Sequence, residues 1–224
     1  MVSNAQDFSP VRTASPSSSG ARARTQPLLA PETVSGGARS AAQRMSVPQR
    51  TASRILSFAQ AAAAGGTSEA LKRFGLSEHA GRPVDEVLPL LVDALCPDDG
   101  GNIDEGIARD ALADAIVELS EQGLGEATEF TSDQLRELFV CFVSNSIKDR
   151  VFNDVGINGI KLPDDIAAVQ NIERTTLEVI RGCVHDSVGQ QLSNLSGISS
   201  QQLQSITHQI YETAYSLVAQ LSEE

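Results

Sequence analysis

The stretch TSDQLRELFVCFVSNSIKDRVFNDV, at residues 131–155, decides the fold of this 224-residue chain. Its apolar residues recur every three or four positions, which is the period of a helix with a buried side. Thr131 and Gln134 have the spacing of a capping box, so we expect the helix to begin there. Because this helix is the most apolar in the sequence, we expect it to lie at the centre of the molecule. Its stripe consists of Leu135, Leu138, Phe139, Phe142, Ile147, Val151 and Val155.

Helical periods continue on both sides of this segment. Asn102 is placed to cap a helix whose buried stripe is expected to start at Ile103. Pro89 kinks or shifts the helix around it, and Gly182 and Gly189 favour a bend or break in another. No segment shows the pattern of a strand pair, so the sequence predicts an all-α bundle of about six helices. Besides the central one, helices are expected over 51–64, 67–74, 83–96, 103–122, 163–195 and 200–222.

The first 50 residues differ from the rest in composition and charge. They are rich in Ser, Ala, Pro, Gly and Arg without an apolar period, which predicts a disordered leader at 1–50 before an acidic helical domain at 51–224. Six arginines against two acidic residues give the leader a net charge of +4. The other residues include 11 basic and 27 acidic side chains, a net charge of −16. A domain with this negative charge repels the phosphate backbone of nucleic acid. We therefore expect its partner to be a basic protein rather than nucleic acid.

The sequence also indicates a compartment. No run approaches the roughly 18 apolar residues of a membrane span, and the first residues, MVSNAQDFSP, lack the apolar core of a signal peptide. Cys96, Cys141 and Cys183 are widely separated, which fits reduced buried thiols better than a disulfide framework. We therefore expect a cytoplasmic protein with no membrane contact. An Arg- and Ser-rich start also describes an organelle transit peptide, although prolines interrupt any long helix there.

Motifs that indicate catalysis or a cofactor are absent from the sequence. It contains no Walker A sequence, no H-E-x-x-H and no C-x-x-C. His185 is close to Cys183 and Asp186, but side chains one or two positions apart on a helix point in different directions. We expect no catalytic residue, no cofactor and no metal, and hence no enzyme. The alternative is a stand-alone helical enzyme or small-ligand binder, which requires Asp110, Asp114 or His185 to meet in a concave site.

A line of acidic residues, Asp110, Asp114, Glu118 and Glu121, follows one side of the helix expected at 103–122. A solvated helix face has this pattern, and so has a surface that docks a basic partner. Carboxylates four residues apart can also hold a metal ion, but no His is placed to join this line. The leader, with Arg22 and Arg24, is the second candidate contact with a partner.

Three segments resemble a known family: GGNIDEGIARDALADAI at 100–116, LFVCFVSNSIKDRVFNDVGINGI at 138–160 and LPDDIAAVQNI at 162–172. They are similar to the QatB proteins of the bacterial Qat anti-phage defence system. The likeness in character extends over most of the chain and includes the Ser/Gly/Pro/Arg-rich leader. In that family QatB acts beside QatA, a KAP-type P-loop ATPase, QatC, which is similar to QueC enzymes of deazaguanine synthesis, and QatD, which is similar to TatD nucleases.

The resemblance implies a non-enzymatic component that is an adaptor or protein substrate, with ATP hydrolysis and nucleotide chemistry supplied by its partners. Family members often begin Met-Gly, and an exposed N-terminus could then be processed or modified by the QueC-like partner. Here Met1 is followed by Val2, which departs from that pattern.

Overall fold

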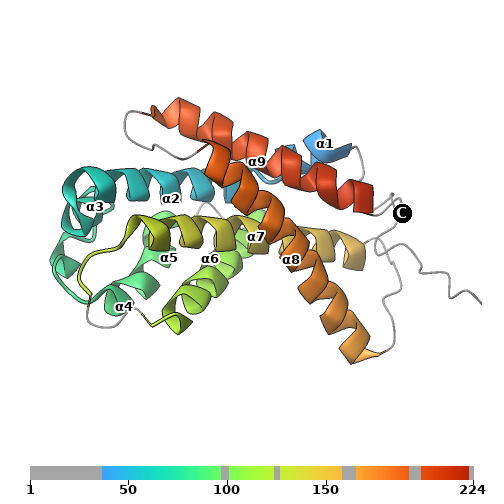
Figure 1. Ribbon diagram of the computed structural model, residues 1–224, viewed down its shortest axis with the longest axis horizontal. Coiled ribbons are helices and arrows are strands. Elements are labelled where there is room, and N and C mark those ends of the chain that lie inside the picture. The colour runs from blue at the N-terminus through green and yellow to red at the C-terminus, as the bar shows by residue number, and fades with distance from the viewer. Residues whose placement is uncertain (1–36, 97–100, 124–126, 158–164, 192–197, 222–224) are drawn as a thin grey trace, which may run out of the picture.

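The computed structural model describes residues 37–96, 101–123, 127–157, 165–191 and 198–221 (Figure 1). Every regular element in these ranges is helical, which confirms the all-α prediction. The longer helices are α1 (Gly37–Arg44), α2 (Ser46–Gly65), α6 (Ile103–Glu121), α7 (Ser132–Ile157), α8 (Ile166–Gln191) and α9 (Ser200–Leu221). The short elements between α2 and α6 are α3 (Thr67–Arg73), η2 (Ser77–His79), α4 (Val84–Val87), η3 (Leu88–Leu90) and α5 (Leu91–Leu95).

Helix α7 lies at the centre, as its sequence predicts, and packs against α2, α6, α8 and α9. Every residue from Leu138 to Ile147 is buried, so this part of α7 is surrounded by protein on all sides. Its buried polar groups are satisfied by hydrogen bonds. Ser144 donates to the carbonyl oxygen of Val140 at 2.7 Å, and the Ser146 and Tyr211 hydroxyls are 2.7 Å apart.

The local signals for helix ends are confirmed by hydrogen bonds. The backbone N–H of Thr131 donates to the Gln134 side chain at 2.8 Å, and the N–H of Gln134 donates to Thr131 Oγ1 at 3.1 Å. The side chain of Asn102 accepts from the N–H of Glu105 at 2.9 Å. Pro89 interrupts the apolar run around it, which consists of α4, η3 and α5 instead of one helix.

The helical region begins earlier than the expected boundary at residue 50. Helix α1 and the first turn of α2 precede that boundary, and Ala42 and Met45 are fully buried there. Because α1 packs against the distant α9, the sequence around α1 alone does not reveal that it is folded. A disordered leader therefore remains a prediction for residues 1–36, which lie outside the described residues.

Two further expectations are wrong in detail. The sequence predicts Ile103 in the buried stripe of α6, but this residue is 60% exposed and lies on the pocket-facing first turn of the helix. Helix α8 runs without a break through Gly182 and Gly189. Its buried residues, Thr176, Ile180, Val184 and Val188, all lie in the part that contacts α7 and α9.

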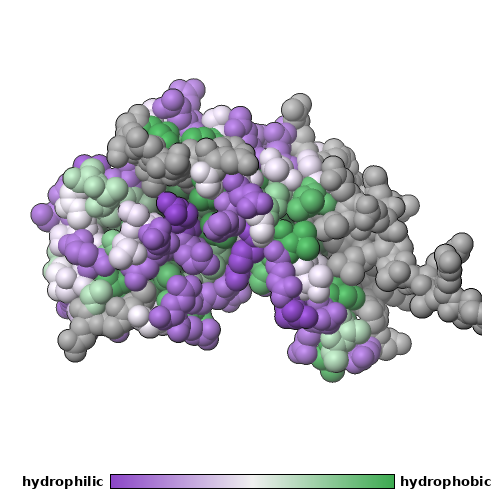
Figure 2. All heavy atoms as spheres, viewed as in Figure 1, coloured by the Kyte–Doolittle hydropathy of each residue, from purple (hydrophilic) through white to green (hydrophobic). Residues whose placement is uncertain are grey.

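The first turns of α8 project from the body (Figure 1). Figure 2 shows hydrophobic residues at this projecting end, where Ile166 is 74% exposed. Among the described residues, no helix combines the length and the apolar character needed to cross a membrane.

Candidate functional site

The acidic line predicted on α6 has two kinds of members. Asp110, Asp114 and Glu121 are exposed, as a docking surface requires. Glu118 is different, because its carboxylate accepts hydrogen bonds from Asn145 of α7, at 3.0 Å, and from the Arg181 guanidinium of α8. Glu118 therefore joins three helices inside the molecule.

The pKa values around Glu118 agree with this structural role. Burial alone would raise the pKa of Glu118, but the hydrogen bond from Asn145 and the charge of Arg181 outweigh it and lower the pKa. Burial strongly raises the pKa of the neighbouring Cys141 thiol, and the Glu118 carboxylate adds to this effect. The glutamate is thus held ionised and the thiol is held protonated.

Helix α7 adds an acidic residue that the sequence analysis missed. Burial raises the pKa of Asp149, Lys148 opposes this through a hydrogen bond, and the charges of Asp114 and Asp110 raise the pKa further. The Asp149 carboxylate pairs with Lys148 at 3.0 Å, and the charges of Asp114 and Asp110 act on it from α6. We call Asp110, Asp114 and Asp149 the acidic cluster. No local pattern links Asp149 to α6, since the proximity depends on how the two helices pack.

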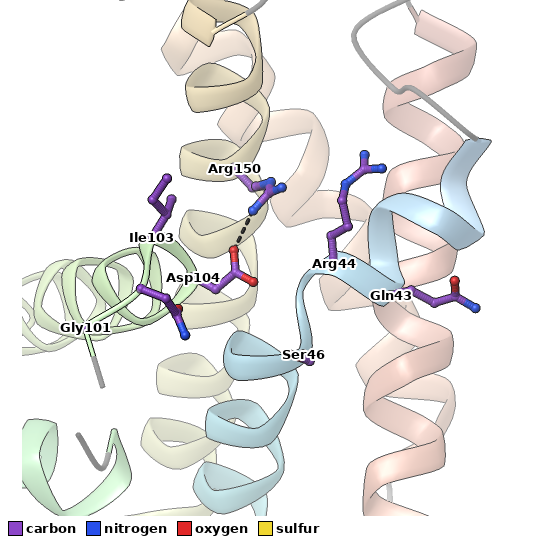
Figure 3. Close-up of a pocket in the computed structure, with 8 residues that line it drawn as sticks. Gln43, Arg44, Ser46, Gly101, Ile103, Asp104 and Arg150 are labelled. Atoms are coloured by element: carbon purple, nitrogen blue, oxygen red, sulfur yellow. Dashed lines mark hydrogen bonds and ion pairs between the residues drawn. The ribbon is translucent and has the colours of Figure 1, made fainter. Parts of the chain in front are cut away.

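A pocket of about 660 Å³ lies at the other end of α6 (Figure 3). One wall is the junction between α1 and α2, and the opposite wall is the first turn of α6 together with one side chain from α7. The residues that line it are Gln43, Arg44, Ser46, Gly101, Asn102, Ile103, Asp104 and Arg150. None of Asp110, Asp114 and His185, the three residues on which the enzyme alternative depends, lines this pocket.

Ion pairs connect the helices around the pocket. Arg150 donates to the carboxylate of Asp104 (Figure 3). The Nε atom of Arg150 lies 3.1 Å from Oδ1 of Asp154. Arg44 reaches the other oxygen of Asp154 at 4.0 Å. Two guanidinium groups and two carboxylates thus balance in charge and tie α1, α6 and α7 together. Of these contacts, the pair of Arg150 with Asp104 connects the start of α6 to α7.

The cysteine and histidine side chains give no support to nucleophilic catalysis. Burial raises the thiol pKa of Cys96, Cys141 and Cys183, which disfavours the reactive thiolate. His185 is exposed on α8, 3.8 Å from Asp186, and His208 contacts Gln49 at 3.1 Å. Within the described ranges, no three His, Cys, Asp or Glu side chains are grouped to hold a metal ion.

The other predicted contact residues lie outside the described part of the chain: Met1, Val2, Arg22 and Arg24. The structure therefore places only the acidic line of α6 among the proposed partner contacts. Asp110 and Asp114 are exposed and act on Asp149, whereas Glu118 holds α6, α7 and α8 together.

Comparison with known proteins gives one match. A family model described as Qat anti-phage system associated protein QatB matches residues 36–218 of the chain. This span starts just before α1 and ends within α9. No curated protein matches the chain, and no solved structure matches it.

Proposed function

The chain belongs to the QatB family, and from this premise we propose that it works without catalysing a reaction, as an adaptor or protein substrate in the Qat complex. As a family member it is a component of the Qat anti-phage defence system and associates with other Qat components. The partners we propose are the QatA-like P-loop ATPase and the QatC-like, QueC-related protein, with the QatD-like nuclease as a third.

The observation that supports this proposal best is the acidic cluster. Asp110 and Asp114 are exposed one helical turn apart on α6, and Asp149 of α7 pairs with Lys148 at 3.0 Å. The two exposed α6 carboxylates give this side of the protein a negative charge. Such a surface attracts a basic partner and speeds the encounter with it.

The buried thiols support the non-enzymatic part of the proposal. Cys141 is almost fully buried and has its pKa raised by that burial and by Glu118, so its thiol is protonated at neutral pH. Its neighbours Glu118 and Arg181 are engaged in holding three helices together. These groups therefore stabilise the fold.

The experiment is co-expression of the tagged full chain with the QatA-like, QatC-like and QatD-like proteins, followed by capture on the tag at moderate and high salt. We expect the ATPase or the QueC-like protein to be captured, and less of it at high salt. The isolated chain is expected to be inert toward nucleotides and nucleic acids. Capture of none of the three proteins, or turnover of a small molecule by the isolated chain, contradicts the proposal.

The pocket beside α6 favours a second candidate function, which is binding of a small ligand. Its volume of about 660 Å³ lies in the ordinary range for small-molecule sites. A ligand that binds the folded state raises the melting temperature of the isolated protein. Native mass spectrometry of the purified chain tests this candidate, because a tightly held ligand adds its mass to the protein and Arg150→Ala removes it.

A further inference from the structure

One side of α6 is left uncovered by every described helix. Figure 1 shows α6 on the side of the body opposite α9, and its buried residues face α7, α2 and α5. Six exposed residues follow one another along the uncovered side at alternating steps of three and four. We call them the α6 seam: Ile103, Gly106, Asp110, Ala113, Val117 and Ser120.

This spacing is the one with which a helix presents a continuous stripe to a second helix. The seam is about 25 Å long, since a helix rises about 1.5 Å per residue. Ile103 and Val117 are 60% and 56% exposed, and with Ile166 they are the large apolar side chains most exposed to solvent in the described part of the chain. Folding of α6 does not require apolar residues at these positions.

The small residues of the seam leave room for close approach. An added Cβ at Gly106 would meet no atom within 4 Å, so nothing in the described structure fills the space above it. Ala113 also lies between the two larger side chains, and Ser120 follows Val117 along the seam. A partner helix can therefore approach the α6 backbone closely and place its own side chains between Ile103 and Val117.

The acidic residues beside the seam indicate that its partner is basic. Asp114 and Glu121 follow one flank of the seam, and Asp110 lies within it. The basic residue of α6, Arg109, is engaged by Asp93 and the carbonyl oxygen of Cys96. Figure 2 shows mostly hydrophilic residues gathered over the lower part of the body, where α6 lies.

We propose that the α6 seam docks an amphipathic helix of another Qat component, with apolar side chains at helical spacing and basic residues on its flanks. The inference rests on the proposed function and adds the surface and the chemistry of the partner. Helix α6 packs against α7 and α2 within the chain, so the seam is formed before the partner arrives.

The test uses the tagged full chain, co-expressed with the other three Qat components and captured on the tag. Val117→Lys and Ile103→Lys replace the apolar contacts by repelling charges, and each is expected to lower capture about tenfold or more. Asp114→Lys is expected to lower capture and to weaken its dependence on salt. Ile166→Lys is the matched control, since it makes the same change at an exposed isoleucine of α8.

The outcomes separate the two proposals. If the unaltered chain captures none of the three proteins, the proposed function fails, and the docking surface fails with it. If it captures them and the seam variants do so equally well, only the seam is wrong. Loss of capture in Ile166→Lys alone overturns the seam and points to α8.

Light scattering of the isolated full chain tests a second copy as occupant. We expect a monomer. A dimer that Val117→Lys separates would assign the seam to a second copy and overturn the proposal. Circular dichroism of each variant should show an unchanged melting curve, since the altered residues are exposed.

Discussion

The middle of α7 and the outer face of α6 belong to neighbouring helices with opposite surroundings. From Leu138 to Ile147 every residue of α7 is buried, and its buried serine and asparagine side chains have hydrogen-bond partners. The outer face of α6 exposes Ile103 and Val117, which are 60% and 56% exposed. Packing in the core explains why the middle of α7 is apolar, whereas no packing contact explains the exposed apolar residues of the α6 seam. Exposed apolar residues that the fold does not need indicate an interaction surface, so the seam is the better candidate for a functional surface.

The largest expected effect is on stability at the centre of α7. Phe142 is fully buried, and Phe142→Ala is expected to lower the free energy of unfolding by about 3–5 kcal/mol, because it leaves a cavity. Val117→Ala on the α6 seam should change it by less than about 0.5 kcal/mol. Urea unfolding of both variants measures the contrast. Similar losses at the two sites would mean that the seam is covered in the folded protein.

The next effect concerns the contact that joins the two regions. Glu118→Gln removes the charge that Arg181 and Asn145 bind, and we expect a loss of about 1–3 kcal/mol at neutral pH. Because the folded-state pKa of Glu118 is lowered, its contribution is present above the ordinary value of 4.5 and is lost as the pH falls below it.

Unfolding curves at neutral pH and at about pH 3 test the sign of this effect. The difference between the unaltered chain and Glu118→Gln should shrink at the lower pH, because Glu118 of the unfolded chain, whose pKa is not lowered, takes up a proton there. A difference that stays constant over this range would show that the charge of Glu118 does not contribute to stability.

The features predicted correctly from the sequence are the ones set by neighbours along the chain. The Thr131–Gln134 capping box, the Asn102 cap and the interruption at Pro89 depend on residues within a few positions. The exposure of Ile103 and the approach of Asp149 to Asp114 depend on how α6 and α7 pack. The sequence therefore predicted the acidic line on α6 but not that Glu118 would be used internally.

Two tyrosines of α9 test how far the buried region depends on satisfied polar groups. The Tyr211 hydroxyl lies 2.7 Å from Ser146 Oγ, whereas the equally buried Tyr215 hydroxyl has no hydrogen-bond partner among the described residues. Tyr211→Phe should cost about 1 kcal/mol, and Tyr215→Phe should be neutral or slightly stabilising. Thermal unfolding compares them. A clear loss in Tyr215→Phe would reveal a partner for this hydroxyl.

A pair of exposed glycines separates folding from function most directly. Gly106 on the α6 seam and Gly182 on α8 are both exposed and helical, and an added Cβ meets nothing within 4 Å at either position. Alanine should therefore stabilise the protein by about 0.5–1 kcal/mol at both sites. On the seam, the same methyl group also occupies the space in which a partner helix would lie.

Gly106→Ala is thus expected to raise the melting temperature and lower capture of the Qat partner, whereas Gly182→Ala raises the melting temperature alone. Thermal unfolding and tag capture of the two full-length variants provide both readouts. Because the substitution and its effect on the fold are the same, only contact with a partner distinguishes the two glycines. Equal capture by both variants would show that no helix approaches α6 closely at Gly106.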